Sequence, residues 1–477
     1  MLAFLVLQGW SSYGRRWVVG FLLLFGGILA LGAFRLASIR LERFFLVWFA
    51  LFSSIRVDVH LYHSGETYGF PFSLNDVAWV ALMGCWIARQ RRSTTRLDVP
   101  RGITFWFSIL ALTSVVAGLR ASFLPTGLRA IFGILQAYLL FLYVWNLPMT
   151  GRDYRLLGYG YCGAILLQAL IGCAQAATQS NLGLEFLGAT EAAFSSQESL
   201  SRVGGTLGWS NRFALFVNTL ILVPVALAFT TRNRLERLAL GAVFTLTVTA
   251  LVLTKSRGGW MSFGLVFLAF VFIALRERWG GFHRTFFLFW TAAIALLLVF
   301  AIPATRERVL ADDQGSAYGR IPMALTAVAM MRDHPAGVGT GNYVSRMLEY
   351  DASDDGMAVR FRHPVHNAYL LVGAEQGILA MIALVAILIL CFRHLWPLVR
   401  SGSPPFPRLL GLALMAGMAT SVIYWLMIAE QPMSKLHNWF QLAMAVHVSR
   451  FVLRGSPPMP SSGAGASRPL PEPAERP

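Results

Sequence analysis

The sequence has 477 residues, of which 56% are apolar and 13% are charged, and its mean hydropathy is +0.58. The charged share is about half of the roughly 25% that soluble domains carry, which excludes a soluble multidomain enzyme. Disorder of the whole chain is excluded as well, because it needs low hydrophobicity. The net charge of +17 would suggest nucleic acid if the basic residues formed one patch, but they occur as short clusters between long apolar runs. This pattern predicts a polytopic inner-membrane protein. Its expected partner is the lipid bilayer, and we expect no nucleic acid to bind.

Apolar runs of membrane-spanning length follow one another along most of the chain. We predict twelve or thirteen spans, near 17–34, 41–55, 74–88, 103–119, 128–147, 156–178, 211–230, 238–254, 260–275, 285–303, 367–391, 409–429 and 438–453. The predicted fold class is therefore all-α, a transmembrane helical bundle.

The cysteines and the two termini add little to this map. All four cysteines fall inside apolar runs without a Cys-x-x-Cys motif, so we interpret them as buried residues and not as disulfides or metal ligands. The first ten residues are apolar but lack a leading positive charge, which does not fit a cleaved signal peptide. The tail 455–477 is rich in Pro, Ser, Gly and Ala and is predicted to be disordered and cytoplasmic.

Arginine-rich loops set the predicted orientation, because short basic loops favour the cytoplasm. The loop 89–101 carries five arginines and one acid, and other basic clusters lie at 35–43, 232–237, 276–284 and 393–408. These loops alternate with loops of the opposite side. The longest of those, 304–366, is nearly neutral and is predicted to be one large periplasmic loop. Strict alternation would place Arg15 and Arg16 outside, against the rule, so the orientation of the N-terminus stays open.

Two cations lie in a very short connection on the predicted periplasmic side. Lys255 and Arg257 flank Ser256, and Gly258 and Gly259 follow. A guanidinium offers a planar pair of donors to a phosphate, and glycines permit a tight turn. A basic connector at the lipid headgroups is the structural alternative, but such connectors favour the cytoplasm. The motif therefore favours an anion-binding role.

A glycine-rich segment enters the span that precedes this connection. Arg202 begins the segment, and Asn211 and Arg212 end it. Backbone N–H groups in such a loop can cradle an anion near a helix N-terminus. The alternative is a flexible loop in which Ser210 or Asn211 caps a helix. Arg212 favours binding, and Arg202 is compatible with either role.

A histidine lies at the mouth of a long apolar helix. His366 is followed by Asn367 and, roughly two to three turns along the helix, by Glu375. A neutral imidazole at this position could take a proton from a hydroxyl, whereas Glu375 would be buried unless paired. A capping or interfacial role is the alternative for His366, but several arginines share this side of the membrane. We interpret His363 as an ordinary loop residue.

The large loop contains one further candidate cation. Arg320 leads an amphipathic stretch, 322–332, that we expect to form a helix on the membrane surface, and structural and functional roles are equally open for it. The glycine-rich turn that follows is interpreted as structural. The segment 430–438 between the last two spans could close a cleft.

Several arginines at one membrane surface favour a polyanionic, lipid-anchored ligand such as a polyprenyl pyrophosphate. The sequence shows no Walker motif and no Asp-rich metal cluster.

The order of these motifs resembles the O-antigen ligase/polymerase superfamily. The resemblance covers roughly residues 200–390, and the N-terminal half matches only as a set of spans. Its motifs are Gly205-Thr206 with Asn211, Lys255-Ser256-Arg257-Gly258, Arg320, His334-Pro335 with Gly337-Val338-Gly339, His366-Asn367 and Glu375-Gln376-Gly377. Members are polytopic inner-membrane glycosyltransferases of the GT-C type. They take a glycan from undecaprenyl pyrophosphate on the periplasmic side and pass it to lipid A core, to another lipid-linked glycan or to a protein.

The resemblance implies roles for individual residues. The arginines that grip the pyrophosphate match Arg212 and Arg257, and less securely Arg320. His366 matches the histidine that acts as base or hydrogen-bond partner of the acceptor hydroxyl. The ligase spacing is satisfied by Asn367 and Gly377, but Ala380 stands where that pattern prefers Gly, Thr or Tyr, which leaves ligase and polymerase open. The predicted pyrophosphate site also includes Lys255 and Arg202, with Asn211, Asn367 and Glu375 in support.

The implied reaction is an inverting glycan transfer that needs no cofactor and no metal, since the pyrophosphate donor is already activated. Four regions are expected: transmembrane helices over 1–200, a ligase/polymerase-like core over 201–391 that includes the loop 304–366, further transmembrane helices over 392–454, and the tail 455–477. A flippase or transporter of lipid-linked oligosaccharide is the alternative, although we see no clear inverted repeat. A scaffolding membrane protein is a third possibility, which would not need His366 beside arginines.

Overall fold

The computed structural model describes residues 41–55, 74–93, 96–190, 202–276, 320–351, 356, 363–400, 406–429 and 435–454, and four two-residue strands between 59 and 72. The predicted spans 17–34 and 285–303 and the tail 455–477 lie outside the described residues. The regional boundaries proposed from the sequence stay predictions.

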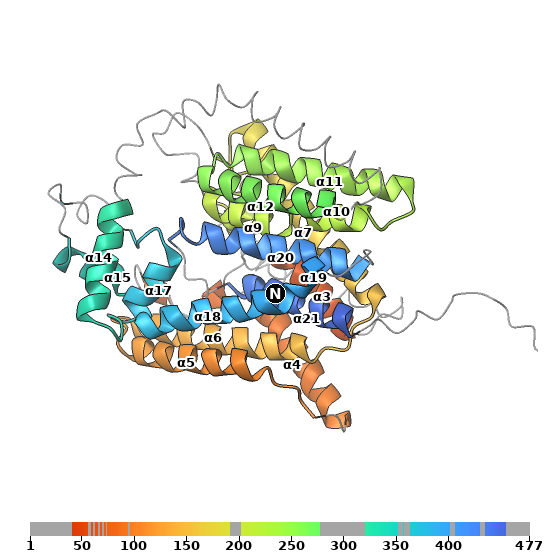
Figure 1. The fold of residues 1–477 in the computed structure, drawn as a ribbon. Coiled ribbons are helices and arrows are strands. Elements are labelled where there is room, and N and C mark those ends of the chain that lie inside the picture. Colours follow the sequence, from red (N-terminus) through yellow and green to blue (C-terminus); the bar gives the residue numbers. More distant parts are fainter. Residues whose placement is uncertain are drawn as a thin grey trace, which may run out of the picture.

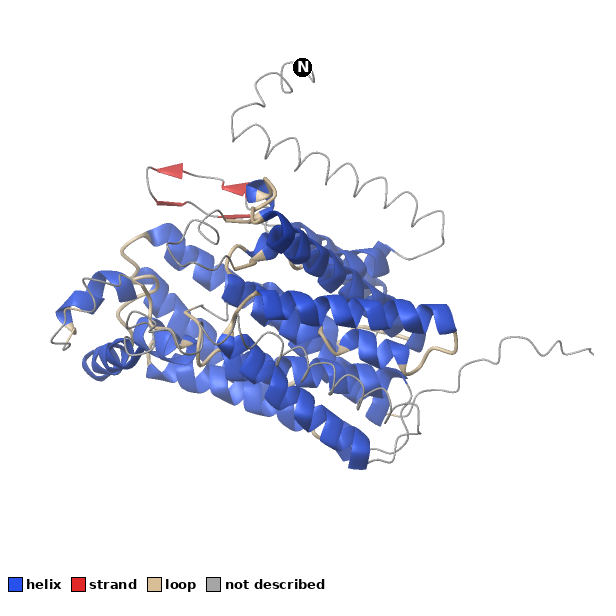
Figure 2. Ribbon diagram, turned by 90° about the horizontal axis from the view of Figure 1, so that it is seen from above, coloured by secondary structure: helices blue, strands red, loops and turns tan. Residues whose placement is uncertain are grey.

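The first half of the described chain is a series of antiparallel helices (Figure 1). They are α3 (Leu41–Phe52), α4 (Leu74–Arg92), α5 (Arg101–Leu119), α6 (Leu124–Trp145) and α7 (Gly151–Thr178), followed by the short η1 (Glu185–Leu187). Two antiparallel ladders, absent from the all-α prediction, lie at the edge of the helical bundle, at the upper left in Figure 2. They pair β1 (Val59–His60) with β4 (Pro71–Phe72) and β2 (His63–Ser64) with β3 (Thr67–Tyr68).

The second half contains the predicted ligase/polymerase-like region. Its elements are η2 (Gly205–Leu207), α9 (Ser210–Leu220), α10 (Val223–Ala228), α11 (Arg234–Leu253), α12 (Arg257–Arg276), α14 (Arg320–Asp333), α15 (Tyr343–Arg346), η3 (Met347–Glu349), α17 (Ala368–Gln376), α18 (Ile378–Leu395), α19 (Pro397–Arg400), α20 (Phe406–Tyr424) and α21 (Leu436–Leu453). Helix α20 packs against α9, α10, α12 and α21 and so lies near the centre of the bundle.

Seven helical stretches in the described part are long and apolar enough to cross a membrane. They are Arg101–Leu119, Leu124–Trp145, Gly151–Thr178, Ser210–Ala228, Arg234–Leu253, Ile378–Arg400 and Phe406–Tyr424. Each corresponds to a predicted span, which confirms a polytopic helical bundle. The predicted spans 41–55, 74–88, 260–275 and 438–453 are also helical, but over the described residues they are shorter or less apolar.

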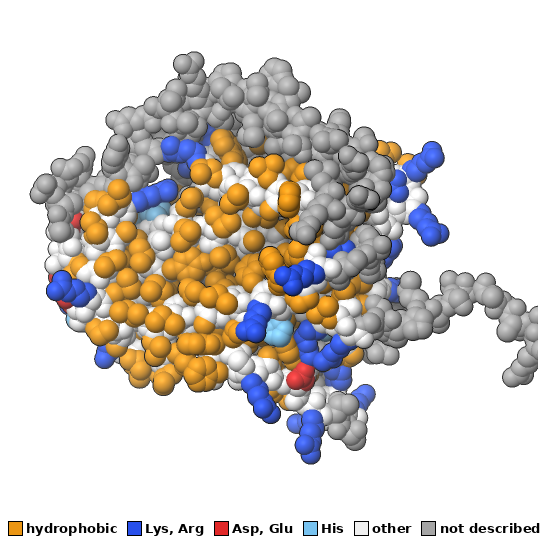
Figure 3. Space-filling model, in the orientation of Figure 1, with side chains coloured by type: hydrophobic (Ala, Val, Ile, Leu, Met, Phe, Trp, Pro, Cys, Tyr) orange, Lys and Arg blue, Asp and Glu red, His pale blue; other side chains and the backbone are white. Residues whose placement is uncertain are grey.

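The bundle has two ends of different character. Because the long helices alternate in direction, the connections after α4, α6, α10, α18 and α21 share one end, which we call the basic end. The arginines 89, 91, 92, 96, 101, 232, 234, 237, 393, 400, 450 and 454 lie in or beside these connections. The described connections after α3, α5, α7, α11 and α20 lie at the opposite end, where α14, α15 and α17 gather (Figure 1). Figure 3 shows a hydrophobic belt across the visible face between basic side chains at its margins.

The predicted span 367–391 is wrong in one respect, because it is not continuous. Helix α17 ends at Gln376, Gly377 adopts a φ of +97°, and α18 starts at Ile378. The Ile378 amide donates to Pro335 O at 3.0 Å, and a Cβ added at Gly377 would lie 2.7 Å from that same oxygen. The glycine-rich turn of the large loop therefore packs directly into a break in the helix.

Helix α14 forms where the amphipathic stretch was predicted. It buries Met323, Thr326, Ala327, Met330 and Met331, and it packs against α17. These positions recur at the three- and four-residue spacing of one helix face. A second row, Ile321, Leu325 and Val328, is exposed. An apolar row facing outward at this end fits the expected position at a membrane surface, which stays a prediction.

Candidate functional site

Two of the predicted binding segments join at the opposite end in one hydrogen-bonded unit, which we call the arginine unit (residues 202–212 and 254–259). The Arg202 side chain donates from Nε to Thr254 O and from Nη2 to Asn211 Oδ1, both at 3.1 Å. Asn211 Oδ1 also accepts a hydrogen bond from Ser256 Oγ at 3.0 Å. Asn211 is therefore not a helix cap, as one interpretation had it, but a connector between the two segments.

The turn that carries the Lys-Ser-Arg motif is strained and tightly packed. Lys255 has a φ of +50°, a left-handed conformation that is uncommon for residues other than glycine. Ser256 Oγ accepts from the Gly259 amide at 3.2 Å, which satisfies one of the orphan donors at the start of α12. Arg257 is thereby fixed as the first residue of that helix.

The glycines after Arg257 permit close approach of neighbouring helices. A Cβ at Gly258 would lie 2.7 Å from the Tyr424 ring, and one at Gly259 would lie 2.8 Å from the Ala214 side chain. Helices α20 and α9 therefore press against the start of α12. The side chains of Arg202, Arg212, Lys255 and Arg257 are all half-buried around this packing.

His366 lies in the short segment before α17. Asn367 is the cap of that helix, since its Oδ1 accepts from the amides of Tyr369 and Leu370 at 3.0 and 3.1 Å. The capping role considered for His366 thus belongs to its neighbour, and the imidazole is half-buried at the helix mouth.

The surroundings of His366 keep its imidazole neutral. Burial lowers the pKa of His366 below its ordinary value, and the positive charge of Arg320 and the nearby His363 lower it further. A neutral imidazole at neutral pH retains a nitrogen that can accept a proton. The structure therefore places Arg320, at the start of α14, as an electrostatic neighbour of His366.

Glu375 is buried and serves the packing of the large loop. Its Oε1 accepts from the Tyr343 amide at 3.4 Å, and its backbone oxygen accepts from the Gly339 amide at 3.0 Å. A Cβ at Gly337 would lie 2.4 Å from that backbone oxygen. These contacts agree with a structural role for the glycine-rich turn.

The C-terminal end of α20 joins the histidine segment to the arginine unit. Trp425 O accepts from the Ala368 amide at 2.8 Å, and Val422 O accepts from the Tyr369 hydroxyl at 3.0 Å. Between them, the Tyr424 hydroxyl lies 2.8 Å from Ser256 Oγ. No motif in the sequence singled out Tyr424, which stands at the end of an apolar run 168 residues after Ser256.

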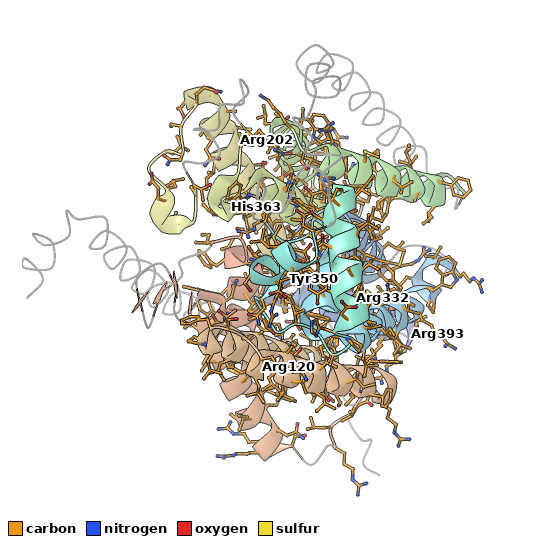
Figure 4. The ribbon with its side chains drawn as sticks, turned by 90° about the vertical axis from the view of Figure 1, so that its left-hand side faces the viewer. Arg120, Arg202, Arg332, Tyr350, His363 and Arg393 are labelled. Atoms are coloured by element: carbon orange, nitrogen blue, oxygen red, sulfur yellow. The ribbon has the colours of Figure 1, made fainter. Side chains whose placement is uncertain are left out.

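Figure 4 looks onto this end of the bundle and shows Arg202, His363, Tyr350 and Arg120 there. Basic and histidine side chains gather near the start of α17 in Figure 3. A cavity of about 370 Å³ lies elsewhere, at the basic end, lined by residues that include Asp98, Trp145 and Arg450. Within the described residues, no group of three His, Cys, Asp or Glu side chains could hold a metal ion.

Comparison with known families adds one finding. Residues 241–385 match the family model of O-antigen ligase. This match supports the resemblance to the O-antigen ligase/polymerase superfamily. It also supports the general function of an O-antigen ligase/polymerase-type enzyme in a multi-pass membrane protein. The matched region contains Lys255, Arg257, Arg320 and His366, whereas Arg202, Asn211 and Arg212 precede it. No curated protein matches the chain.

Proposed function

We propose that the protein transfers a glycan from undecaprenyl pyrophosphate to an acceptor hydroxyl at the periplasmic face of the bacterial inner membrane. The observation that carries this proposal is the pair of hydrogen bonds by which the end of α20 holds the histidine segment next to the arginine unit. Cations for a leaving pyrophosphate and a neutral base for an attacking hydroxyl thereby share one end of the bundle. The acceptor is lipid A core, another glycan or a further hydroxyl compound.

The arginine unit supplies the charge for the donor. Arg257 begins α12, where the partial positive charge of the helix N-terminus adds to that of the guanidinium. Arg212, Arg202 and Lys255 lie on the same hydrogen-bonded segments. Cations fixed in place before the reaction stabilise the charge that develops on the pyrophosphate as its bond to the sugar breaks. The same charges hold the donor's phosphates at the interface while its lipid tail lies in the bilayer.

His366 supplies the base. The acceptor oxygen forms a bond to the anomeric carbon, and the bond from that carbon to the phosphate oxygen breaks. The acceptor proton passes to the His366 imidazole, and the electron pair of the broken bond leaves with undecaprenyl pyrophosphate. Attack opposite the leaving group inverts the anomeric centre. Residues of the chain supply both the charge and the base, so the proposed reaction is independent of metal.

The test is transfer by the purified protein in bilayers with a lipid-linked glycan donor. Arg257→Ala and His366→Ala are each expected to lower turnover by about 100-fold or more, as loss of a main electrostatic or acid–base group does. Arg346→Ala is the matched control. Arg346 lies at the same end but is exposed and pairs with Glu349 at 2.9 Å, so its loss should leave turnover unchanged.

Two outcomes would contradict the proposal. Unchanged transfer in both site variants would remove Arg257 and His366 from the reaction. Movement of intact lipid-linked glycan across the bilayer without a new glycosidic bond would indicate the transporter. The phenotype of a deletion separates the two enzymes: unpolymerised single units indicate a polymerase, and polymer retained on the carrier lipid indicates a ligase.

A further inference from the structure

The hydrogen bonds around Ser256 have a defined direction. Asn211 Oδ1 accepts from Arg202 Nη2, which can only donate, and an oxygen of this type has no hydrogen to give. Ser256 Oγ must therefore donate its single hydrogen to Asn211 Oδ1. The Tyr424 hydroxyl, 2.8 Å from Ser256 Oγ, must in turn donate to Ser256. The chain of hydrogen bonds thus runs from Tyr424 through Ser256 to Asn211, which also accepts a hydrogen bond from the guanidinium of Arg202.

Both the side chain of Tyr424 and the backbone next to it make contacts within the fold. Its side chain is 1% exposed, and its ring lies against Gly258. The adjacent Trp425 O holds the start of α17, two residues after His366. One turn at the end of α20 therefore contacts both halves of the proposed site.

We propose that Tyr424 is a positioning residue for glycan transfer, one that fixes the arginine unit relative to His366. The proposal rests on the proposed function. Tyr424 touches neither the reacting carbon nor the proton in this scheme and acts through Ser256 and Asn211. Displacement of reacting groups by about 1 Å can cost about 100-fold in rate, so a rigid link between the two halves affects turnover directly.

The variant Tyr424→Phe keeps the ring that packs on Gly258 and removes only the donor. We expect turnover at saturating donor to fall by about tenfold, and the KM for the lipid-linked donor to change by less than about twofold, because every cation is retained. The matched control is Tyr154→Phe. The Tyr154 hydroxyl is equally buried and lies 2.8 Å from His447 Nδ1, on a pair that joins α7 and α21 away from the arginine unit. Its loss should lower the melting temperature and leave turnover unchanged.

A double-mutant cycle with Ser256→Ala provides a second readout. Since both changes break the same chain of hydrogen bonds, their effects on turnover should be clearly less than additive. Should Tyr424→Phe not be recovered as folded protein, Ser256→Ala alone should lower turnover by at least as much, since it also removes the bonds of Ser256 to Asn211 and Gly259.

Turnover of Tyr424→Phe equal to that of Tyr154→Phe, or additive effects in the cycle, would overturn the positioning role. If the wild-type protein transfers glycan and Arg257→Ala does not, that result leaves the proposed function intact. An absence of transfer by the wild-type protein would contradict both the proposed function and the positioning role of Tyr424.

Discussion

At the scale of single residues, the proposed chemistry depends on keeping one imidazole neutral. Burial and the charge of Arg320 hold the pKa of His366 below its ordinary value. Replacing Arg320 by Gln removes a positive neighbour, favours the protonated imidazole and raises this pKa. The acid limb of the pH profile of turnover should therefore move to higher pH, which a turnover series between pH 5 and pH 8 (about one and a half units either side of the pKa of an ordinary histidine) would detect.

The control for this prediction is Arg320→Lys, which keeps the positive charge and should leave the acid limb in place. A profile that does not move in Arg320→Gln would mean that His366 does not limit turnover on the acid side.

Residue type and the predicted side of the membrane were enough to propose Lys255, Arg257 and His366 as site residues, because ionisable groups at a membrane mouth are costly unless they have a function. The same reasoning could not find Tyr424 or the role of Asn211. The roles proposed for them rest on hydrogen bonds between positions 45 and 168 residues apart, and only the tertiary fold creates such pairs.

At the scale of elements, the break between α17 and α18 depends on two glycines. Gly337, at a φ of +84°, has Glu375 O 2.4 Å from the site of a Cβ. Gly337→Ala must strain the backbone and push the turn away, and it should lower the free energy of unfolding by about 2 kcal/mol. The melting temperature of the purified protein measures this effect.

The control is Gly241→Ala in α11, where an added Cβ would meet nothing within 4 Å. Alanine should be neutral or stabilising there by up to about 1 kcal/mol, since glycine is a poor helix former. Equal melting temperatures for the two variants would show that the turn tolerates displacement. The sequence interrupts the apolar run at Glu375-Gln376-Gly377, but the apolar residues on both sides of that triplet predicted one continuous span, and the break was therefore missed.

Helix α21 carries two amides at a cost to stability. Both polar atoms of Asn438 and of Gln441 are buried without a hydrogen-bond partner in the described structure. Removing buried unsatisfied atoms is favourable, so Asn438→Leu and Gln441→Leu should each raise the melting temperature, by the equivalent of about 1 kcal/mol or more.

The opposite result is expected for Gln136→Leu in α6. That amide is equally buried, but it donates to Asp76 at 2.7 Å and accepts from Arg129 at 3.0 Å. Its loss leaves a buried carboxylate short of a donor and should lower the melting temperature. If Asn438→Leu and Gln441→Leu lowered the melting temperature as Gln136→Leu does, the two α21 amides would have to be hydrogen-bonded in the bilayer.

At the scale of the whole molecule, the different charge of the two ends predicts on which side of the membrane each end lies. Arg96 at the basic end and Ser122 at the opposite end are both exposed. With the four native cysteines replaced, Ser122→Cys should react with a membrane-impermeant thiol reagent from the periplasm, and Arg96→Cys should react only after the inner membrane is opened. Reaction of both from the same side would contradict the alternating arrangement.

The sequence could predict the bundle because hydropathy and loop charge act locally, as the agreement over 103–119 or 156–178 shows. It could not predict how the helices associate. The central place of α20 depends on close contacts such as that of Gly417, where an added Cβ would lie 1.9 Å from Thr219 O. Such contacts follow from packing in three dimensions and leave no periodic trace in the chain.

The hydrogen bonds of Ser256 also bear on the stereochemistry of the proposed reaction. A hydroxyl has one hydrogen and two lone pairs. In Ser256 the hydrogen goes to Asn211, and the lone pairs accept from Gly259 and Tyr424. An oxygen with no electron pair to spare is a poor nucleophile, so the one hydroxyl inside the Lys-Ser-Arg motif is unsuited to hold the sugar as a covalent intermediate. A double displacement through Ser256 is therefore disfavoured, and a donor linked in one anomeric configuration should yield a product of the other.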